Sequence, residues 1–115
     1  MSSHSISIAP ASKTVRVTFK GVVIAESTQA LDLREGNYPT VKYIPRADVD
    51  MTRLRRSAHH TTCPFKGEAN YFSIVVDGAI AENAIWTYET PLPGVAAIKE
   101  HVAFYPDRVD RIEEI

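Results

Sequence analysis

The chain has 115 residues, a single cysteine, a hydrophobic fraction of 44% and a formal net charge of −1 at pH 7. That length supports one modest hydrophobic core, and the composition is typical of an ordinary soluble globular protein. Acidic and basic residues are interleaved along the chain, so it lacks the basic stripe of a nucleic-acid-binding protein. No apolar run approaches the roughly 20 residues that a membrane-spanning helix needs. We therefore expect neither a nucleic-acid nor a membrane partner.

The N-terminal residues and the cysteine content indicate the compartment. Residues 1–12 lack the basic start and the continuous apolar segment of a signal peptide. One cysteine, Cys63, cannot form an intramolecular disulfide or supply a multi-thiolate zinc site. We predict a cytoplasmic protein in a reducing compartment, with a flexible leader over residues 1–13 and one β-rich domain over residues 14–115.

The first half of the chain shows the period-two alternation of half-buried strands. It is strictest over residues 14–20, where Val15, Val17 and Phe19 share one face. A turn at Lys20-Gly21 leads into an antiparallel partner strand over residues 22–26, and further strands are predicted over residues 30–34 and 40–44. Ile6 and Ile8 also alternate, which leaves a short strand inside the leader as an alternative.

The second half adds a loop, a hairpin and two short helices. Asp48 is the expected N-cap of a helix over residues 50–56, and residues 59–67 are expected to form an irregular loop. Residues 69–76 and 79–88 flank Asp77-Gly78, the strongest short-range hairpin signal. A second helix is predicted over residues 95–101, with Ala96 or Ala97 and Ile98 facing inward. Strands over residues 102–105 and 108–112 complete the chain.

This order of elements lacks the regular alternation of strand and helix that a parallel sheet requires. The predicted fold class is therefore mainly β: a compact antiparallel two-sheet domain with two short helices.

Five motifs occur in a fixed order along most of this chain. They are Tyr43-Ile-Pro-Arg-Ala-Asp48, Thr62-Cys-Pro-Phe-Lys-Gly67, Asn83-Ala-Ile-Trp-Thr-Tyr88, Pro91-Leu-Pro93 and Phe104-Tyr-Pro-Asp-Arg-Val-Asp110. As an ordered set over residues 14–110, they resemble the bacterial and fungal domain-of-unknown-function family four-two-seven, which is sometimes labelled nucleotidyltransferase-like.

The resemblance implies a fold similar to the two-sheet β-tent shared by zinc-bearing chaperone-like and methionine-sulfoxide-reductase-like domains. It supplies no established activity. The cysteines that hold zinc in those tent-shaped domains have no counterpart here, because Cys63 stands alone.

Residues 59–71 concentrate the groups that can do chemistry, and we expect a small-ligand pocket beside the 59–67 segment. Aromatic walls with a few convergent donors are typical of such pockets, and lysine and arginine suit a carboxylate or phosphate. We therefore predict a small polar or anionic ligand, with no cofactor. The residues expected to bind it are Arg56, Thr61, Lys66, Tyr71, Trp86, Tyr88, Tyr43 and Asn83.

Two alternatives belong to other classes of protein. In the first, Cys63 is a nucleophile or redox thiol with His60 as its base, although a free cysteine is also among the most buried residue types. In the second, the protein is an interaction module that pairs through an exposed strand edge. The alternating strand over residues 14–20 makes a homodimer an alternative to a monomer.

Asp48 and Asp50 are the carboxylates that a nucleotidyltransferase would use to hold Mg²⁺. Pro39 and Pro45 exclude the helix that precedes such a pair, so capping and a favourable first-turn charge explain these aspartates more simply. His59 and His60 are adjacent and would point to opposite faces of a strand. We predict no metal site.

Overall fold

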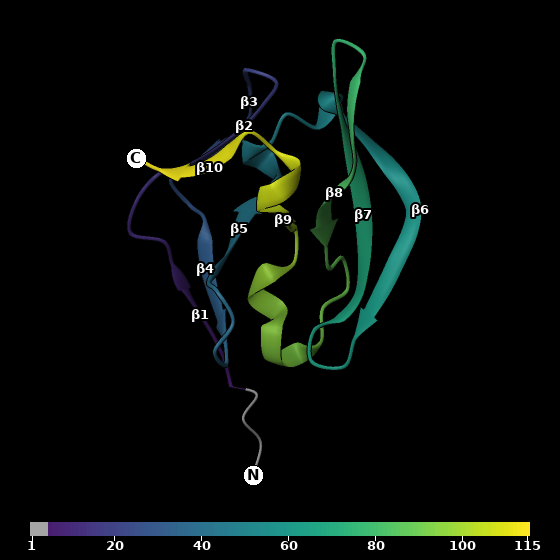
Figure 1. The fold of residues 1–115 in the computed structure, drawn as a ribbon. Coiled ribbons are helices and arrows are strands. Elements are labelled where there is room, and N and C mark those ends of the chain that lie inside the picture. The colour runs from purple at the N-terminus through teal and green to yellow at the C-terminus, as the bar shows by residue number, and fades with distance from the viewer. Residues whose placement is uncertain (1–4) are drawn as a thin grey trace.

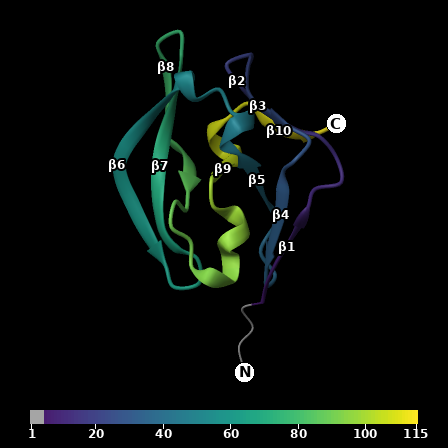
Figure 2. The ribbon, with the colours of Figure 1, turned by 180° about the vertical axis from the view of Figure 1, so that it is seen from behind.

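A bent seven-stranded antiparallel sheet forms most of the structure, with strand order β1-β4-β5-β9-β8-β7-β6 (Figure 1). The computed structural model describes residues 5–115. In chain order the strands of this sheet are β1 (Ile6–Pro10), β4 (Leu31–Glu35), β5 (Val41–Pro45), β6 (Leu54–Cys63), β7 (Gly67–Val76), β8 (Ala79–Thr87) and β9 (His101–Phe104). Figures 1 and 2 show β1 and β4 on one side of the molecule and β6, β7 and β8 on the other.

A second sheet, of three strands in the order β10-β2-β3, packs against the larger one. It consists of β2 (Val15–Phe19), β3 (Val22–Ser27) and β10 (Arg111–Glu114). The predicted mainly β, two-sheet antiparallel fold is therefore confirmed.

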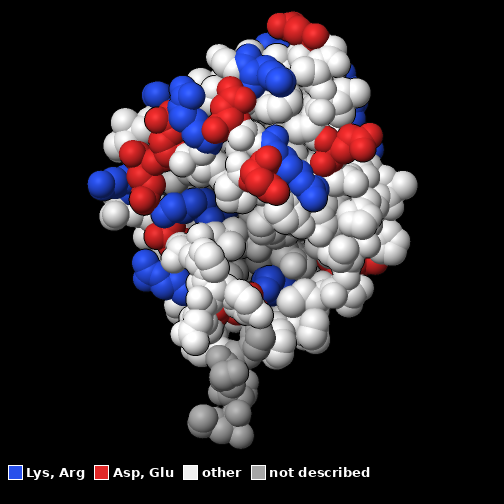
Figure 3. All heavy atoms as spheres, in the orientation of Figure 1, with Lys and Arg blue, Asp and Glu red and all other residues white. Residues whose placement is uncertain are grey.

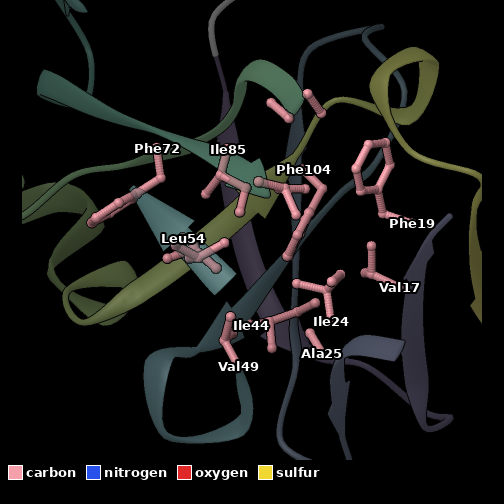
Figure 4. Close-up of a cluster of buried hydrophobic side chains, with 14 of the residues drawn as sticks. Val17, Phe19, Ile24, Ala25, Ile44, Val49, Leu54, Phe72, Ile85 and Phe104 are labelled. Atoms are coloured by element: carbon pink, nitrogen blue, oxygen red, sulfur yellow. The ribbon is translucent and has the colours of Figure 1, made fainter. Parts of the chain in front are cut away.

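Side-chain alternation divides the large sheet into two apolar faces. On β7, Phe72, Ile74 and Val76 belong to one buried cluster, whereas Ala69 and Tyr71 belong to the other. The first cluster lies between the two sheets and includes the residues labelled in Figure 4. The second lies on the opposite face of the large sheet and contains most of the buried tyrosines. Each face therefore has its own core.

The large sheet divides between β5 and β9. These strands share only the pairs Ile44↔Val102 and Pro45↔His101 among the described residues, although β9 continues along β8 to Phe104. Tyr43 and Ala103, which would form the next pair, are not joined in the ladder. The first half of β5 thus diverges from β9 and leaves a gap in the sheet.

Within residues 5–115 the structure contains four short 3-10 segments: η1 (Arg46–Asp48), η2 (Met51–Arg53), η3 (Pro93–Ile98) and η4 (Pro106–Arg108). Of these, η2 and η3 lie where the two helices were predicted. The helix expected over residues 50–56 is wrong beyond Arg53, because β6 begins at Leu54 and pairs with β7. Asp50, rather than Asp48, caps the short turn by accepting from the Thr52 amide.

The second predicted helix is wrong in kind, and of its predicted inward residues only Ile98 is buried. In η3 the buried side chains are Val95 and Ile98, while Ala96 and Ala97 are exposed. Val95 has non-helical dihedral angles (φ −127°, ψ 29°), so the segment is kinked there and is not one regular helix.

The loop expected over residues 59–67 is a strand hairpin instead. Residues up to Cys63 belong to β6, β7 begins at Gly67, and only residues 64–66 form the turn. The period-two pattern was obscured because most of β6 is exposed on both faces at the edge of the sheet.

Two hairpins agree with their predicted turns. Lys20-Gly21 and Asp77-Gly78 all have positive φ, the backbone conformation of the two-residue turns that match the twist of paired strands. β2 pairs with β3, and β7 pairs with β8, both antiparallel.

The flexible leader expected over residues 1–13 is wrong for Ile6–Pro10, which form β1 and pair with β4; the alternative strand around Ile6 and Ile8 is the one observed. Residues 1–4 of that leader lie outside the described residues.

The strand over residues 14–20 was considered as a strand that could pair in a homodimer. β2 is the central strand of the small sheet and Val15 and Val17 are fully buried, so this strand offers no free edge for pairing.

Two isoleucines of β8 provide a matched test of the first core. Ile85 is 0% exposed and Ile80 is 59% exposed. We expect Ile85→Ala to lower the free energy of unfolding by about 2–5 kcal/mol, because it leaves a cavity in a close-packed interior. Ile80→Ala should change it by less than about 0.5 kcal/mol. Urea unfolding followed by circular dichroism measures both, and equal losses would contradict this assignment of the two faces.

Candidate functional site

An aromatic cavity of about 250 Å³ opens on the face of the large sheet that carries the second core. β4 and β5 contribute one side of it, and β7 and β8 contribute the other. Its lining residues are Leu33, Glu35, Tyr38, Val41, Tyr43, Lys66, Tyr71, Trp86, Tyr88 and Tyr105. The sheet positions these residues because alternate side chains of each strand point to the same face.

The aromatic rings of the cavity contact one another. The Trp86 and Tyr105 ring centres are 4.5 Å apart, and the Tyr43 ring stands edge-on to Trp86 at 6.3 Å. Trp86 Nε1 donates a hydrogen bond to Tyr43 Oη at 3.1 Å. Tyr71 stacks on Tyr105 at 6.5 Å, and their hydroxyls are 3.4 Å apart. These contacts restrict the rings to one arrangement before any ligand enters.

Lys66 and Glu35 are the charged residues that line this cavity. Lys66 Nζ donates to Glu35 Oε1 at 2.6 Å, and the two side chains are only 10% and 14% exposed. An ammonium group carries three N–H donors, and Glu35 is the only acceptor of Lys66 Nζ among the described residues. Lys66 can therefore donate further hydrogen bonds into the cavity.

The turn that carries Lys66 is held in place through its backbone. Lys66 N donates to Cys63 O at 3.3 Å, and Lys66 O accepts from Leu92 N at 3.0 Å. Gly67 follows with φ of +112°, and a Cβ there would lie 3.3 Å from Thr90 O. A side chain at position 67 would strain the backbone and crowd the 90–92 segment. Glycine therefore permits the close contact that aims Lys66 at the cavity.

Burial changes the acidity of three of these phenols. Desolvation raises the pKa of Tyr43 to about 12, which the hydrogen bond from Trp86 partly opposes. Desolvation also raises the pKa of Tyr88. For Tyr105, desolvation and the hydrogen bond with Tyr71 raise the pKa to about 12. These hydroxyls stay protonated at neutral pH and can donate hydrogen bonds.

Tyr88 is the phenol best placed to meet a ligand. The residue is 6% exposed, yet none of the described residues exchanges a hydrogen bond with its hydroxyl. Tyr88 lines the cavity, so its hydroxyl is available to donate a hydrogen bond to a ligand there.

The structure brings together five of the residues predicted as a ligand site: Tyr43, Lys66, Tyr71, Trp86 and Tyr88. Thr61 is one step removed, because its hydroxyl contacts the Tyr71 hydroxyl at 3.0 Å. Five lining residues were missed, namely Leu33, Glu35, Tyr38, Val41 and Tyr105. Glu35 follows Leu31 and Leu33 at alternate positions, and Tyr105 follows Ala103 in the same way, so strand periodicity could have found both.

Arg56 lies outside the cavity. Its guanidinium is bound to Glu89 at 2.6 Å and stands 5.0 Å from the centre of the Phe72 ring. Arg46 and Asn70 also donate to Glu89, at 2.7 Å and 3.1 Å. The hydrogen bonds from the two arginines lower the pKa of Glu89, that from Arg56 contributing most. The expectation that Arg56 and Lys66 share one anion is therefore not met by their placement.

Asn83 also lies outside the cavity. It adopts a φ of +49° at an irregularity between β7 and β8, where its amide donates to Ser73 Oγ at 3.0 Å. Asparagine tolerates this left-handed conformation better than most residues. Asn83 therefore has a structural role at the irregularity where β8 pairs with β7.

Cys63 and His60 are not brought together. They are three residues apart on regularly paired β6, so their side chains leave opposite faces of the strand. His60 is exposed and lies 3.4 Å from Glu68, while Cys63 is half-buried against the second core. His59 shares the Cys63 face but contacts the Tyr71 ring, and four strand residues span about 13 Å.

The aspartates of the nucleotidyltransferase interpretation are engaged locally. Asp48 accepts from the Ser27 hydroxyl at 2.5 Å, and Asp50 binds the Thr52 hydroxyl and Arg53. Within residues 5–115, no group of three or more His, Cys, Asp or Glu side chains is arranged to hold a metal ion.

The two antiparallel sheets and this cavity define a small β domain of the kind that the ordered motifs indicated. Residues 7–115 match the family model NTP_transf_9, described as a domain of unknown function (DUF427). The chain belongs to the DUF427 family, and the resemblance of its motifs is confirmed. A search of curated proteins gives no match. None of the helices described is long and apolar enough to cross a membrane.

Alkaline titration tests the burial of the cavity phenols. An ordinary tyrosine has a pKa of 10.0, and those of Tyr43 and Tyr105 are about 12. A raised pKa in the folded state stabilises the protein below pH 10, and this contribution is lost as the pH rises through about 12. Phenolate absorbance should show late-ionising tyrosines, and Tyr105→Phe should remove one of them. Ionisation of every tyrosine near pH 10 in folded protein would contradict this account.

Alkylation of the one thiol tests the Cys63–His60 pair. Because the two side chains leave opposite faces of β6, we expect His60→Gln to leave the rate of reaction with iodoacetamide unchanged. The urea-unfolded protein gives the reference rate of the free thiol. A fall of about tenfold or more in folded His60→Gln would show that His60 activates the thiolate.

Proposed function

We propose that the protein binds a small planar polar molecule in the aromatic cavity. The observation that carries this proposal is the convergence of six aromatic side chains on a space whose charged lining residues form one ion pair, Lys66–Glu35. Concave apolar sites with a few fixed polar groups are the usual form of a small-molecule site.

The volume limits the size of the ligand. Drug-sized ligands occupy pockets of roughly 300–1,000 Å³, and this cavity measures about 250 Å³. A single ring with one or two polar substituents fits that space. Trp86 and Tyr105, tilted by 48° at 4.5 Å, offer ring faces and edges for such a ligand.

The Lys66–Glu35 ion pair determines whether the polar group of the ligand is neutral or charged. Glu35 already neutralises Lys66, so the charged lining carries little net attraction for an anion. A neutral acceptor such as an amide carbonyl can bind a remaining Lys66 N–H without separating the pair. Tyr88 Oη is a second donor directed at the same ligand. The ligand expected from the sequence, polar or anionic, is thereby narrowed to a neutral polar one.

The distribution of surface charge supports a small ligand rather than a polyanion. Figure 3 shows Lys and Arg side chains alternating with Asp and Glu over the upper part of one face, above a hollow with a largely uncharged rim. Such interleaved charge produces no extended field of one sign.

Trp86 makes the proposal directly testable, because it is the only tryptophan of the chain. Its indole N–H resonance is a unique reporter beside Tyr43. Benzamide, nicotinamide and 2-pyridone at millimolar concentration should shift this resonance in a saturable way. Absence of a shift with all three would overturn the proposal.

The Lys66 variant must avoid leaving an unpaired buried carboxylate. We therefore combine Lys66→Met with Glu35→Gln and expect binding of benzamide to weaken by at least about tenfold, the loss of one charge-assisted hydrogen bond. Arg56→Met is the matched control, since it also removes an ion-paired cation but lies outside the cavity. Unchanged binding by the double variant would contradict the role of Lys66.

A further inference from the structure

A second cavity, of about 480 Å³, lies on the opposite face of β5, between the large and small sheets. Most of its lining is apolar. The residues around it are Val17, Tyr38, Pro39, Thr40, Val41, Lys42, Ile44, Trp86, Phe104, Pro106 and Ile112. Val17, Ile44 and Phe104 belong to the first core, whereas Tyr43 of the aromatic cavity belongs to the second.

Lys42 is the charged residue of this lining, and its charge is already compensated. Lys42 Nζ binds Asp32 at 2.6 Å and Glu114 at 2.9 Å. The cavity therefore offers apolar surface and little polar attraction. Small-molecule sites occupy concave, mostly apolar spaces of roughly 300–1,000 Å³, and this open cavity falls in that range.

The two cavities meet at the gap in the large sheet. Tyr38, Val41 and Trp86 line both of them, although the cavities belong to opposite faces. The shared residues flank the place where β5 leaves β9, beyond the pair Ile44↔Val102. The β5–β9 pairs end at Ile44↔Val102, so among the described residues no backbone ladder separates the two cavities beside Trp86.

From this geometry we infer one continuous site for an amphipathic small molecule, with a planar polar head in the aromatic cavity and an apolar tail in the second cavity. This inference rests on the proposed function, since the head is the ligand proposed above. The fixed ion pair and the Tyr88 hydroxyl orient the head, and Val17, Phe104 and Ile112 surround the tail.

A homologous series separates the two parts of the ligand. Benzamide carries the head alone, and 4-propylbenzamide and 4-hexylbenzamide add tails of increasing length. Burial of one methylene stabilises a complex enough to tighten Kd by about fourfold. Calorimetric titration should therefore give a Kd that falls steeply from benzamide to the hexyl compound.

Two variants locate the tail. Ile112→Phe enlarges a half-buried side chain of the second cavity and should abolish most of the gain from the tail while leaving benzamide binding unchanged. Val109→Phe is the matched control, because Val109 is also half-buried against the first core but lines neither cavity. It should leave the whole series unchanged, and a thermal melt of each variant establishes that it is folded.

The outcomes separate this inference from the proposed function. Benzamide binding without any gain from the tail overturns the continuous site and leaves the proposed function standing. A gain that persists in Ile112→Phe places the tail elsewhere and also overturns the inference. Failure of benzamide, nicotinamide, 2-pyridone and both alkyl compounds to shift the Trp86 indole resonance overturns both.

Discussion

The hydrogen bond from Trp86 Nε1 to Tyr43 Oη connects β8 to β5 beside the place where β5 diverges from β9. Trp86 pairs with Ala103 across β8 and β9, and the small alanine lets the indole lie across β9 toward β5. A larger residue at position 103 would displace the ring. Together with the pairs Ile44↔Val102 and Pro45↔His101, this contact joins the two halves of the sheet, and both of its rings line the aromatic cavity.

The charged groups of the aromatic cavity follow from the same geometry. β4 brings Glu35 to one side, and the turn before Gly67 brings Lys66 to meet it. Burying either charge alone would be costly, whereas the pair compensates most of that cost. A neutral pair with unused donors favours hydrogen bonding to a ligand over attraction of a net charge, which distinguishes this cavity from a phosphate-binding site built on backbone amides.

The label attached to the family suggests nucleotidyl transfer, but the carboxylates that would support it have structural roles. Asp48 ties the turn after β5 to Ser27 of β3, and Asp50 caps the turn that leads into β6. Both therefore stabilise the connection between the two sheets. Membership of the DUF427 family defines the fold of this chain, and the chemistry of its cavity must be argued from its own residues.

The sequence by itself determined the strands with clear alternation, the Lys20-Gly21 and Asp77-Gly78 turns, the two-sheet class and five of the residues around the cavity. These depend on local periodicity and turn chemistry, which a single chain displays directly. It misplaced β6, because an edge strand exposed on both faces carries no apolar alternation. It also assigned helices where η2 is one 3-10 turn and η3 is a kinked 3-10 segment.

Only the tertiary structure decided which predicted residues meet. Arg56 and Lys66 are close in sequence, yet the β6–β7 hairpin carries one to Glu89 and the other to Glu35. Cys63 and His60 are separated because a strand sends residues three apart to opposite faces. The gap between β5 and β9 has no signature in either strand, since pairing between distant segments depends on the packing of the whole sheet and not on the local sequence.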